Sequence, residues 1–450
     1  MIQNIKNNIK IIFNYLIQNP IRNLILFGIL FRTFFFLIFY TSVSIYTDTE
    51  GYVELSQLIS SFNLMGYHGL RTVGYPLVIS LFNQNLYLVV LFQFILGIAT
   101  SIIWYKTILN LKYSIKSSFI ITLFLSSFLS VFFFETSILV EALVLFMVSI
   151  MFYLISNKIL DNLNIKNLIG LSTFFAFLIM IKPFYAFLPF LILLFVFFKN
   201  PCWKTILSKN LIILILPLFA YYGWCYFNKI NTGYFAPTSY YGLTNAQNCV
   251  YFAEKAPKEF DWISKPYVKY REQSIKENRD VAMTIWFTIG QGAFDKYNLT
   301  FEELSFELGK FAKATIIKNP VDYLKQVVCR SWYDFWRTTL ILNEEKFNSK
   351  NAENICDAIW SFQHLYLRLF KLIFIGLIPY YLYLFYKNRK VTNEFMIIVI
   401  VFANSVLQAL VTYGTNNRYS YPYEFIMVIL VLLFLKNKIK LPKKLNTFLQ

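Results

Sequence analysis

Residues 167–197 read NLIGLSTFFAFLIMIKPFYAFLPFLILLFVF and are flanked by the lysines Lys166 and Lys199. This run is too long for a single membrane crossing, because about 20 apolar residues span a bilayer. Short basic segments mark the cytoplasmic side, so a run with lysines at both ends must cross twice. Pro183 lies near the middle, where it breaks the helix. The stretch therefore predicts two short membrane helices that turn close to the outer face.

The same pattern continues over most of the 450 residues. The chain is 57% hydrophobic and only 15% charged, against roughly 25% charged residues in a soluble domain. This composition excludes soluble enzymes, DNA-binding modules and disulfide-stapled secreted domains. Together with the two short helices, the apolar runs predict about ten transmembrane helices with both termini in the cytoplasm. The other runs lie near residues 24–46, 86–105, 118–134, 137–156, 210–228, 366–386, 394–412 and 421–435.

The net charge of +18 has a topological origin. Residues 229–362 hold 17 Lys/Arg against 16 Asp/Glu, so most of the excess lies in short segments between apolar runs. Basic loops of this kind mark the cytoplasmic side of a membrane protein. We therefore expect membrane lipids as neighbours and no nucleic-acid partner.

The long segment 229–365 has mixed charge and predicts a mostly helical extracytoplasmic domain inserted after helix seven. Within it, residues 301–317 show apolar positions at helical spacing, and Asn319-Pro320 ends that pattern. The predicted fold class is an all-α polytopic membrane protein. Its predicted parts are a transmembrane module at 1–228 with a first external loop at 47–85, the domain at 229–365, and C-terminal transmembrane helices with a basic cytoplasmic tail at 366–450.

The cysteines and histidines do not form a metal-binding pattern. There are five Cys, no CxxC pair and two His, so a Cys/His metal site is not expected. For Cys249, Cys329 and Cys356 two interpretations stay open: one disulfide with one thiol left over, or three unpaired thiols. Asp48 and Glu50 are carboxylates of the kind that Mg²⁺ or Mn²⁺ prefers, but two of them do not make a cage. Binding of a divalent cation, Mg²⁺ or Mn²⁺, is left open.

Ionisable residues gather at the predicted outer ends of the helices, where they are costly unless they face a cavity or a partner. This many on one side predicts a polar site that opens to the outside. The alternative interpretations are purely structural: the acids cap helix N-termini, and the cations extend their charged ends to the membrane interface. The residues are Asp48, Glu50, Glu54, Glu135, Glu141 and Glu424, with Arg32, Arg71, Lys182 and Arg418.

Several short motifs, taken in order, resemble the GT-C class of membrane glycosyltransferases that use polyprenyl-phosphate sugars. This class includes the protein O-mannosyltransferases and the aminoarabinose transferases of lipid A. The resemblance spans nearly the whole chain. It indicates the class of enzyme but does not indicate the substrate. Its motifs are DTEGY at 48–52, RTVGYPL at 71–77, ETSILVEAL at 135–143, IKP at 181–183, KNPVDYLKQ at 318–326 and NNRYSYP at 416–422.

The resemblance implies a role for each matching residue. Asp48 matches the acidic residue of the first external loop, the expected catalytic base, and Glu50 stands beside it as a second catalytic candidate. Lys182 stands where an Arg is usual, and Val73 where a Pro is usual, so a point charge replaces the bidentate guanidinium at the first of these positions. The implied substrate-binding residues are Arg71, Glu141, Lys182, Arg418 and Tyr419.

The implied activity is transfer of a sugar from a polyprenyl-phosphate carrier to a lipid, glycan or protein acceptor on the outer face, with inversion. The implied location is the bacterial inner membrane. The alternative is a polysaccharide polymerase or ligase, which would use a diphosphate-linked glycan. A transporter is a more distant alternative, because it should show two inverted halves with broken helices at corresponding positions.

Overall fold

The computed structural model describes residues 17–202, 204, 208–414 and 416–438. The described residues form helices, and their only β-structure is an isolated bridge between Ser44 and Ser137. In this part of the chain, six helices are long and apolar enough to cross a membrane, as in a multi-pass membrane protein. They are Pro20–Phe39 (α2 with η1), Leu86–Asn110 (α5), Lys209–Thr232 (η4 with α12), Lys350–Asn388 (α19), Asn393–Val411 (α20) and Asn416–Asn437 (α21 to α22).

The remaining predicted crossings coincide with shorter or bent helices. α6 (Ile115–Ser126) and α7 (Leu129–Thr136) meet at 53° and form up to one further span. Three other apolar helices have only 10–17 residues. They are α8 (Glu141–Ser156), α9 (Ile165–Ile181) and Pro183–Lys199, which contains η3 and α10 (Leu188–Lys199). The break at Pro183 is present as expected. Ten crossings therefore stay a prediction, and the N-terminal lysines Lys6 and Lys10 and the tail from 439 lie outside the described residues.

Two predicted helices have the wrong ends. The first helix ends at Phe39 instead of 46, and the helix predicted from 137 begins at Glu141. The chain between these limits is extended instead, since Ser44 N donates to the carbonyl of Thr136 (2.9 Å) and Ile138 N donates to that of Ser44 (3.0 Å). Residues 40–46 (YTSVSIY) are rich in Ser, Thr and Val, which favour extended or side-chain-bonded backbone over helix.

The helix predicted at 366–386 is the C-terminal part of α19, a helix of 39 residues. Ser349 caps its start by accepting a hydrogen bond from Ala352 N (3.2 Å). No Gly or Pro interrupts the sequence between Lys350 and Gly376, so the helix continues across residue 365. The predicted boundary between the domain and the C-terminal helices thus falls inside a helix.

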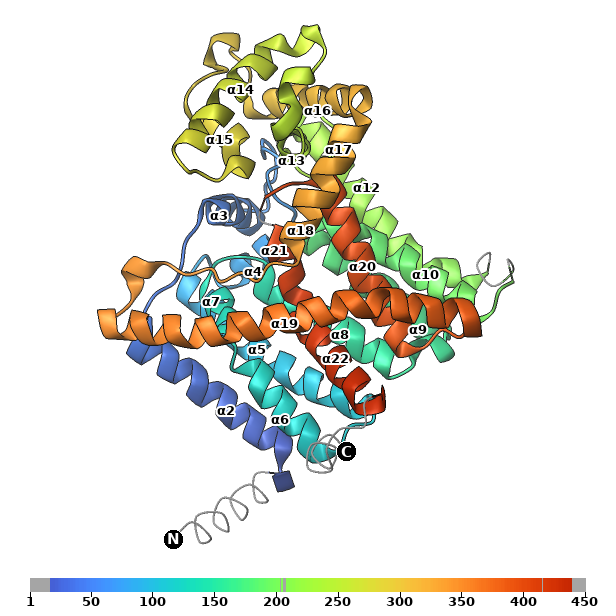
Figure 1. The fold of residues 1–450 in the computed structure, drawn as a ribbon. Helices are drawn as coiled ribbons and strands as arrows, with labels where there is room; N and C mark the ends of the chain where they lie inside the picture. The colour runs from blue at the N-terminus through green and yellow to red at the C-terminus, as the bar shows by residue number, and fades with distance from the viewer. Residues whose placement is uncertain (1–16, 203, 205–207, 415, 439–450) are drawn as a thin grey trace.

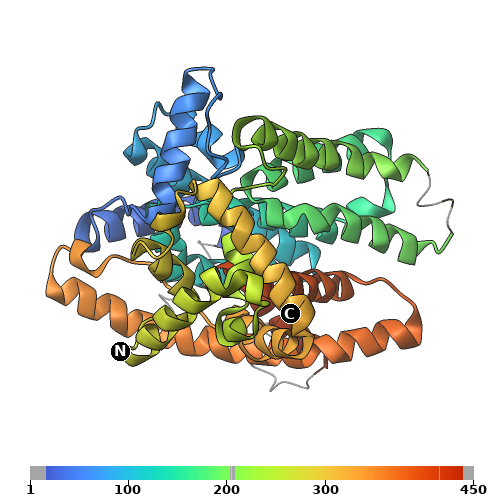
Figure 2. The ribbon, with the colours of Figure 1, turned by 90° about the horizontal axis from the view of Figure 1, so that it is seen from above.

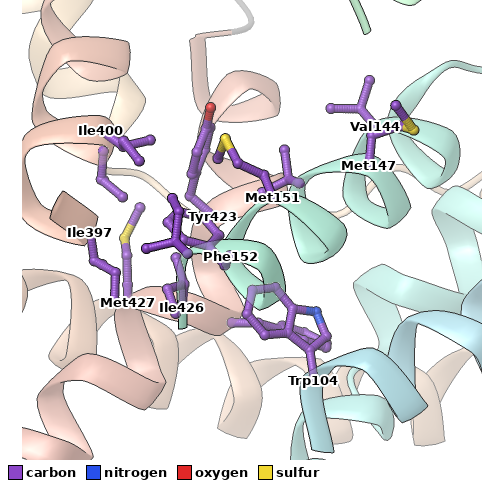
Figure 3. Close-up of a cluster of buried hydrophobic side chains, with 14 of the residues drawn as sticks. Trp104, Val144, Met147, Met151, Phe152, Ile397, Ile400, Tyr423, Ile426 and Met427 are labelled. Atoms are coloured by element: carbon purple, nitrogen blue, oxygen red, sulfur yellow. The ribbon is translucent and has the colours of Figure 1, made fainter. Parts of the chain in front are cut away.

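The apolar helices share one large core, of which Figure 3 shows a part around Trp104, Met151, Phe152 and Tyr423. A separate core lies in the inserted segment, where Leu243, Tyr267, Ile285, Leu308 and Phe311 are fully buried. It joins α13 (Tyr241–Gln247), α14 (Asp261–Lys276), α15 (Thr284–Gly290) and α16 (Phe301–Lys318). In Figure 1 these helices stand together on one side of the apolar bundle, and Figure 2 views the molecule from that side.

α4 (Gly74–Leu81) packs into the bundle, since Tyr75 and Ile79 are buried in the main core. Gly74 permits this packing, because a Cβ there would lie 2.6 Å from the backbone of Met180. The close approach brings the loop before α4, which carries Arg71, next to the end of α9, which carries Lys182. All five cysteines are unpaired, so none of the possible disulfides is present.

Candidate functional site

The first turn of α3 (Thr47–Ser60) carries Asp48. Thr49 fixes this turn, since its Oγ1 accepts a hydrogen bond from Tyr46 N (3.0 Å) and donates one to the carbonyl of Ile138 (3.1 Å). Ile138 lies three residues before Glu141, the first residue of α8. The start of α3 and the start of α8 are thereby held together, with both carboxylates at the same end of the bundle.

Five segments of the chain meet around Asp48 and Glu141. Asp48 accepts hydrogen bonds from Arg71 Nη2 on Oδ1 (2.8 Å) and from Arg418 Nη1 on Oδ2 (3.2 Å). Arg418 also binds Glu141 Oε1, with Nη2 at 2.9 Å and Nε at 3.1 Å. Lys182 Nζ lies 3.8 Å from the same oxygen. We call Asp48, Arg71, Glu141, Lys182 and Arg418 the charge cluster.

Aromatic rings hold the cations of the charge cluster. The Arg71 guanidinium carbon lies 4.8 Å from the ring centre of Tyr52 and 4.6 Å from that of Tyr240. Lys182 Nζ lies 3.9 Å from the ring centre of Tyr419, which is a cation–π contact. Tyr419 was predicted at the site, whereas Tyr52 and Tyr240 were not. Tyr52 follows Asp48 by one helical turn, which is a usable signal, but nothing in the sequence points to Tyr240.

The charge cluster carries an excess positive charge. Three cations face two carboxylates, which leaves one positive charge on the cluster. The Glu141 side chain is 1% exposed, and its Oε2 has no hydrogen-bond partner among the described residues. The Asp48 side chain is 30% exposed, so the cluster reaches solvent at Asp48. Such a site suits a bound anion, which would neutralise it.

The electrostatics keep Asp48 ionised. Burial alone would raise the pKa of its carboxyl group. The guanidinium groups of Arg71 and Arg418 act in the opposite direction and together hold this pKa below its ordinary value. Asp48 is therefore a weak base as long as both guanidinium groups stay bound to it.

Glu50 does not join the charge cluster. Its side chain is exposed on α3, and it forms no ion pair with any residue in the described ranges. Within those ranges there is also no group of three or more Asp, Glu, His or Cys that would hold a metal ion. His68 lies outside the charge cluster, with its Nδ1 2.9 Å from Glu302 Oε1 of α16.

The short helix α21 (Asn416–Ser420), which carries Arg418, is fixed at both ends. At its start, Asn416 N donates to Asp334 Oδ2 (3.0 Å), and Asn416 Nδ2 donates to the carbonyl of Ser331 (3.2 Å). At its end, Lys371 Nζ of α19 donates to Ser420 Oγ (2.8 Å). The position of Arg418 is thus set by two segments far from it in sequence.

Two buried ion pairs support the bundle around the charge cluster. Lys371 Nζ lies 2.7 Å from Glu424 Oε1, and both side chains are almost completely buried. Arg32 binds Glu135 through two hydrogen bonds, from Nε (2.7 Å) and Nη2 (2.6 Å). Arg32, Glu135 and Glu424 are among the residues predicted from the sequence, without their partners, whereas Lys371 is not. A single lysine inside the apolar run at 366–386 is the signal that could have found it.

No family model, no curated protein and no solved structure matches this chain. The cluster joins a weak base with three cations at one end of an apolar bundle.

Proposed function

We propose that the protein is a membrane glycosyltransferase that moves a sugar from a polyprenyl-phosphate carrier to an acceptor hydroxyl on the outer face. The observation that carries this proposal is the convergence of Asp48 and three cations in one cluster with an excess positive charge. The apolar helices around the cluster suit a donor with a lipid tail. The reaction class is taken from the order of the motifs that resemble the GT-C class, because the contacts of the charge cluster do not specify a reaction.

The three cations are the candidates for binding the donor phosphate. In the reaction, the bond between the anomeric carbon and the phosphate oxygen breaks, and the phosphate leaves with the electron pair. The acceptor oxygen forms the new bond to the anomeric carbon from the opposite side, which inverts that centre. A departing phosphate needs no proton when preorganised cations stabilise its charge. Arg71, Lys182 and Arg418 would provide that stabilisation.

Asp48 is the candidate base for the acceptor hydroxyl proton. In the structure both of its oxygens are bound by guanidinium groups, which makes it a poor base. A phosphate that binds Arg71 and Arg418 would compete for the same donors and release at least one Asp48 oxygen. Donor binding would then raise the pKa of Asp48 at the moment when a base is required.

The test is turnover of lipid-linked sugars by the purified, full-length protein, with mass spectrometry of the acceptor fraction. Asp48→Asn should lower turnover by roughly 10²-fold or more, because it removes the base and keeps the shape. Glu50→Gln is the matched control, since Glu50 lies on the same helix outside the charge cluster. Near-normal turnover in a folded Asp48→Asn protein would contradict the proposed base. Turnover with a diphosphate-linked donor alone would instead indicate a polymerase or ligase.

The cations are tested with single-turnover rates and donor affinity. Arg418→Gln should reduce the rate more than the affinity, by about 2–4 kcal/mol in activation free energy, because charge at a departing anion counts most in the transition state. Lys182→Arg should keep substantial activity, whereas Lys182→Gln should not. Equal rates in the wild type and in Arg418→Gln would contradict the phosphate-binding role.

A further inference from the structure

One helical segment of the inserted domain exposes a row of apolar side chains. The segment is continuous over α17 (Pro320–Gln326), the π-helix η9 (Val327–Ser331) and α18 (Trp332–Phe335). The first three side chains of the row are three or four residues apart, and the wider π-helical turn places the fourth in line with them, five residues further on. Each is between 55% and 77% exposed. We call this row the apolar stripe, which consists of Val321, Leu324, Val328 and Tyr333.

The opposite side of the segment is buried and is partly polar. Gln326 and Ser331 are completely buried there, together with Phe335. Ser331 Oγ donates a hydrogen bond to Asn248 Oδ1 (3.1 Å), so this hydroxyl group is used inside the protein. A helix at a water-covered surface has the reverse arrangement, with its apolar side inward and its polar side outward. The segment therefore fits an apolar environment around its exposed side.

The segment is fixed along the end of α20, one of the helices that are long and apolar enough to cross a membrane. Tyr323 Oη donates to the carbonyl of Leu410 (2.7 Å), the penultimate residue of α20. Trp332 Nε1 donates to Ser405 Oγ (3.0 Å). Five residues separate these two contacts on α20, which is roughly 8 Å along the helix axis. The segment thus slopes from the end of the membrane helix toward its middle, with α18 beside α20 in Figure 1.

The surface next to the apolar stripe identifies its environment as lipid. Leu410 and Val411 at the end of α20 are also exposed, so the stripe continues the lipid-facing surface of a membrane helix. Helices that lie in the membrane interface reach about 5–10 Å into the boundary between head groups and acyl chains, which matches the slope along α20. Lys325 is exposed beside Leu324 and forms no ion pair within the described ranges. A lysine at this position can extend its ammonium group to a lipid phosphate.

We propose that the apolar stripe lies in the membrane leaflet on the side of the inserted domain, covered by phospholipid acyl chains, with Lys325 at the level of the lipid phosphates. The inference concerns a surface outside the charge cluster and does not rest on the proposed reaction. It has a consequence for the site, because Asp334 of α18 accepts the hydrogen bond from Asn416 N that fixes the start of α21 (3.0 Å). The helix that carries Arg418 is therefore attached to a segment that the membrane holds in place.

The experiment measures the depth of nitroxide labels on the full-length protein in nanodiscs of phosphatidylcholine and phosphatidylglycerol. The exposed cysteines are removed by Cys202→Ser and Cys329→Ser, and the three other cysteines are buried. Single cysteines are then introduced along the segment and labelled. Collisions of each label with oxygen, which concentrates among acyl chains, and with a water-soluble nickel chelate are measured by power saturation. The variants are Val321→Cys, Lys325→Cys, Val328→Cys and Tyr333→Cys.

Ile275→Cys is the matched control, because Ile275 is an exposed apolar residue (48%) of the same domain, on α14. Labels on the apolar stripe should collide with oxygen more than with nickel, in contrast to the label at 275. Their depth should increase from position 321 to position 333 by up to about 8 Å, following the slope along α20. The label at 325 should lie nearer the phosphates than the label at 328.

Two results would overturn the proposal. Stripe labels with the same nickel access as the label at 275 would show that water covers this surface. Stripe labels that neither oxygen nor nickel reaches would show that protein covers it, and dipolar broadening of their spectra would identify a second copy of the chain. A label at 325 that lies deeper than the label at 328 would contradict the position given to Lys325.

Discussion

Removal of the Lys371 side-chain charge is the most direct test of the buried architecture behind the charge cluster. The Lys371 ammonium has three oxygen partners within 2.9 Å, namely Glu424 Oε1 (2.7 Å), Ser420 Oγ (2.8 Å) and the carbonyl of Arg337 (2.9 Å). Its side chain is 3% exposed, and that of Glu424 is 2% exposed. Lys371→Met keeps the length of the side chain and leaves the Glu424 carboxylate buried without a counter-charge.

The expected loss of stability follows from that uncompensated charge. Removal of one partner of a buried ion pair costs about 3–5 kcal/mol. An unfolding entropy of about 2.1 cal/mol/K per residue corresponds to about 0.9 kcal/mol/K for a chain of this length, so the melting temperature should fall by about 3–5 °C. The double variant Lys371→Met/Glu424→Leu removes both charges and should recover most of this loss, because apolar replacements of buried pairs are often neutral.

The assay is thermal unfolding of the detergent-solubilised protein, followed by the amount that stays monodisperse after heating. Lys387→Met is the control, since Lys387 lies on the same helix with an exposed side chain. Lys371→Met with wild-type stability would refute the reasoning. A double variant that is as unstable as the single one would show that the uncompensated charge of Glu424 is not the cause.

Three further predictions concern other parts of the molecule. Gly97→Ala should destabilise the protein strongly, because a Cβ would lie 1.7 Å from Glu135 Oε1, whereas Gly170→Ala, with open space around it, should be neutral in the same melting assay. Because the folded-state pKa of Asp48 lies below its ordinary value, its ion pairs stabilise the protein above about pH 4 and lose this effect as the pH falls through the lowered value. Asp48→Asn should thus cost stability at pH 7 and less in strong acid, and an equal difference at both pH values would contradict the ion pairs. Cysteine-accessibility labelling should reach the turn between α19 and α20 from the cytoplasm and the exposed positions of α14 from outside, and the reverse pattern would contradict the topology.

Some parts of the fold are local consequences of the sequence. Runs of about 20 apolar residues form helices wherever no breaker interrupts them, and Pro183 breaks residues 167–197 where a proline cannot continue a helix. α16 also follows from local signals, since Thr300 and Glu303 form its capping box and Asn319-Pro320 ends it. The ends of the first helix and of α8 could not be predicted in this way. Their extended backbone is stabilised by pairing between segments about 90 residues apart.

The candidate site, too, has one part that local sequence predicts and another part that depends on the packing of distant segments. The set of candidate ionisable residues follows from the sequence alone, because a charge within an apolar run must have a partner or a polar site. Which residues become partners depended on the packing of helices from distant parts of the chain. Only the tertiary structure placed Arg418 between Asp48 and Glu141, left Glu50 in solvent and paired Lys371 with Glu424. It also brought Tyr240 onto Arg71, since a contact over 169 positions depends on how the inserted domain docks and leaves no periodic signal in the chain.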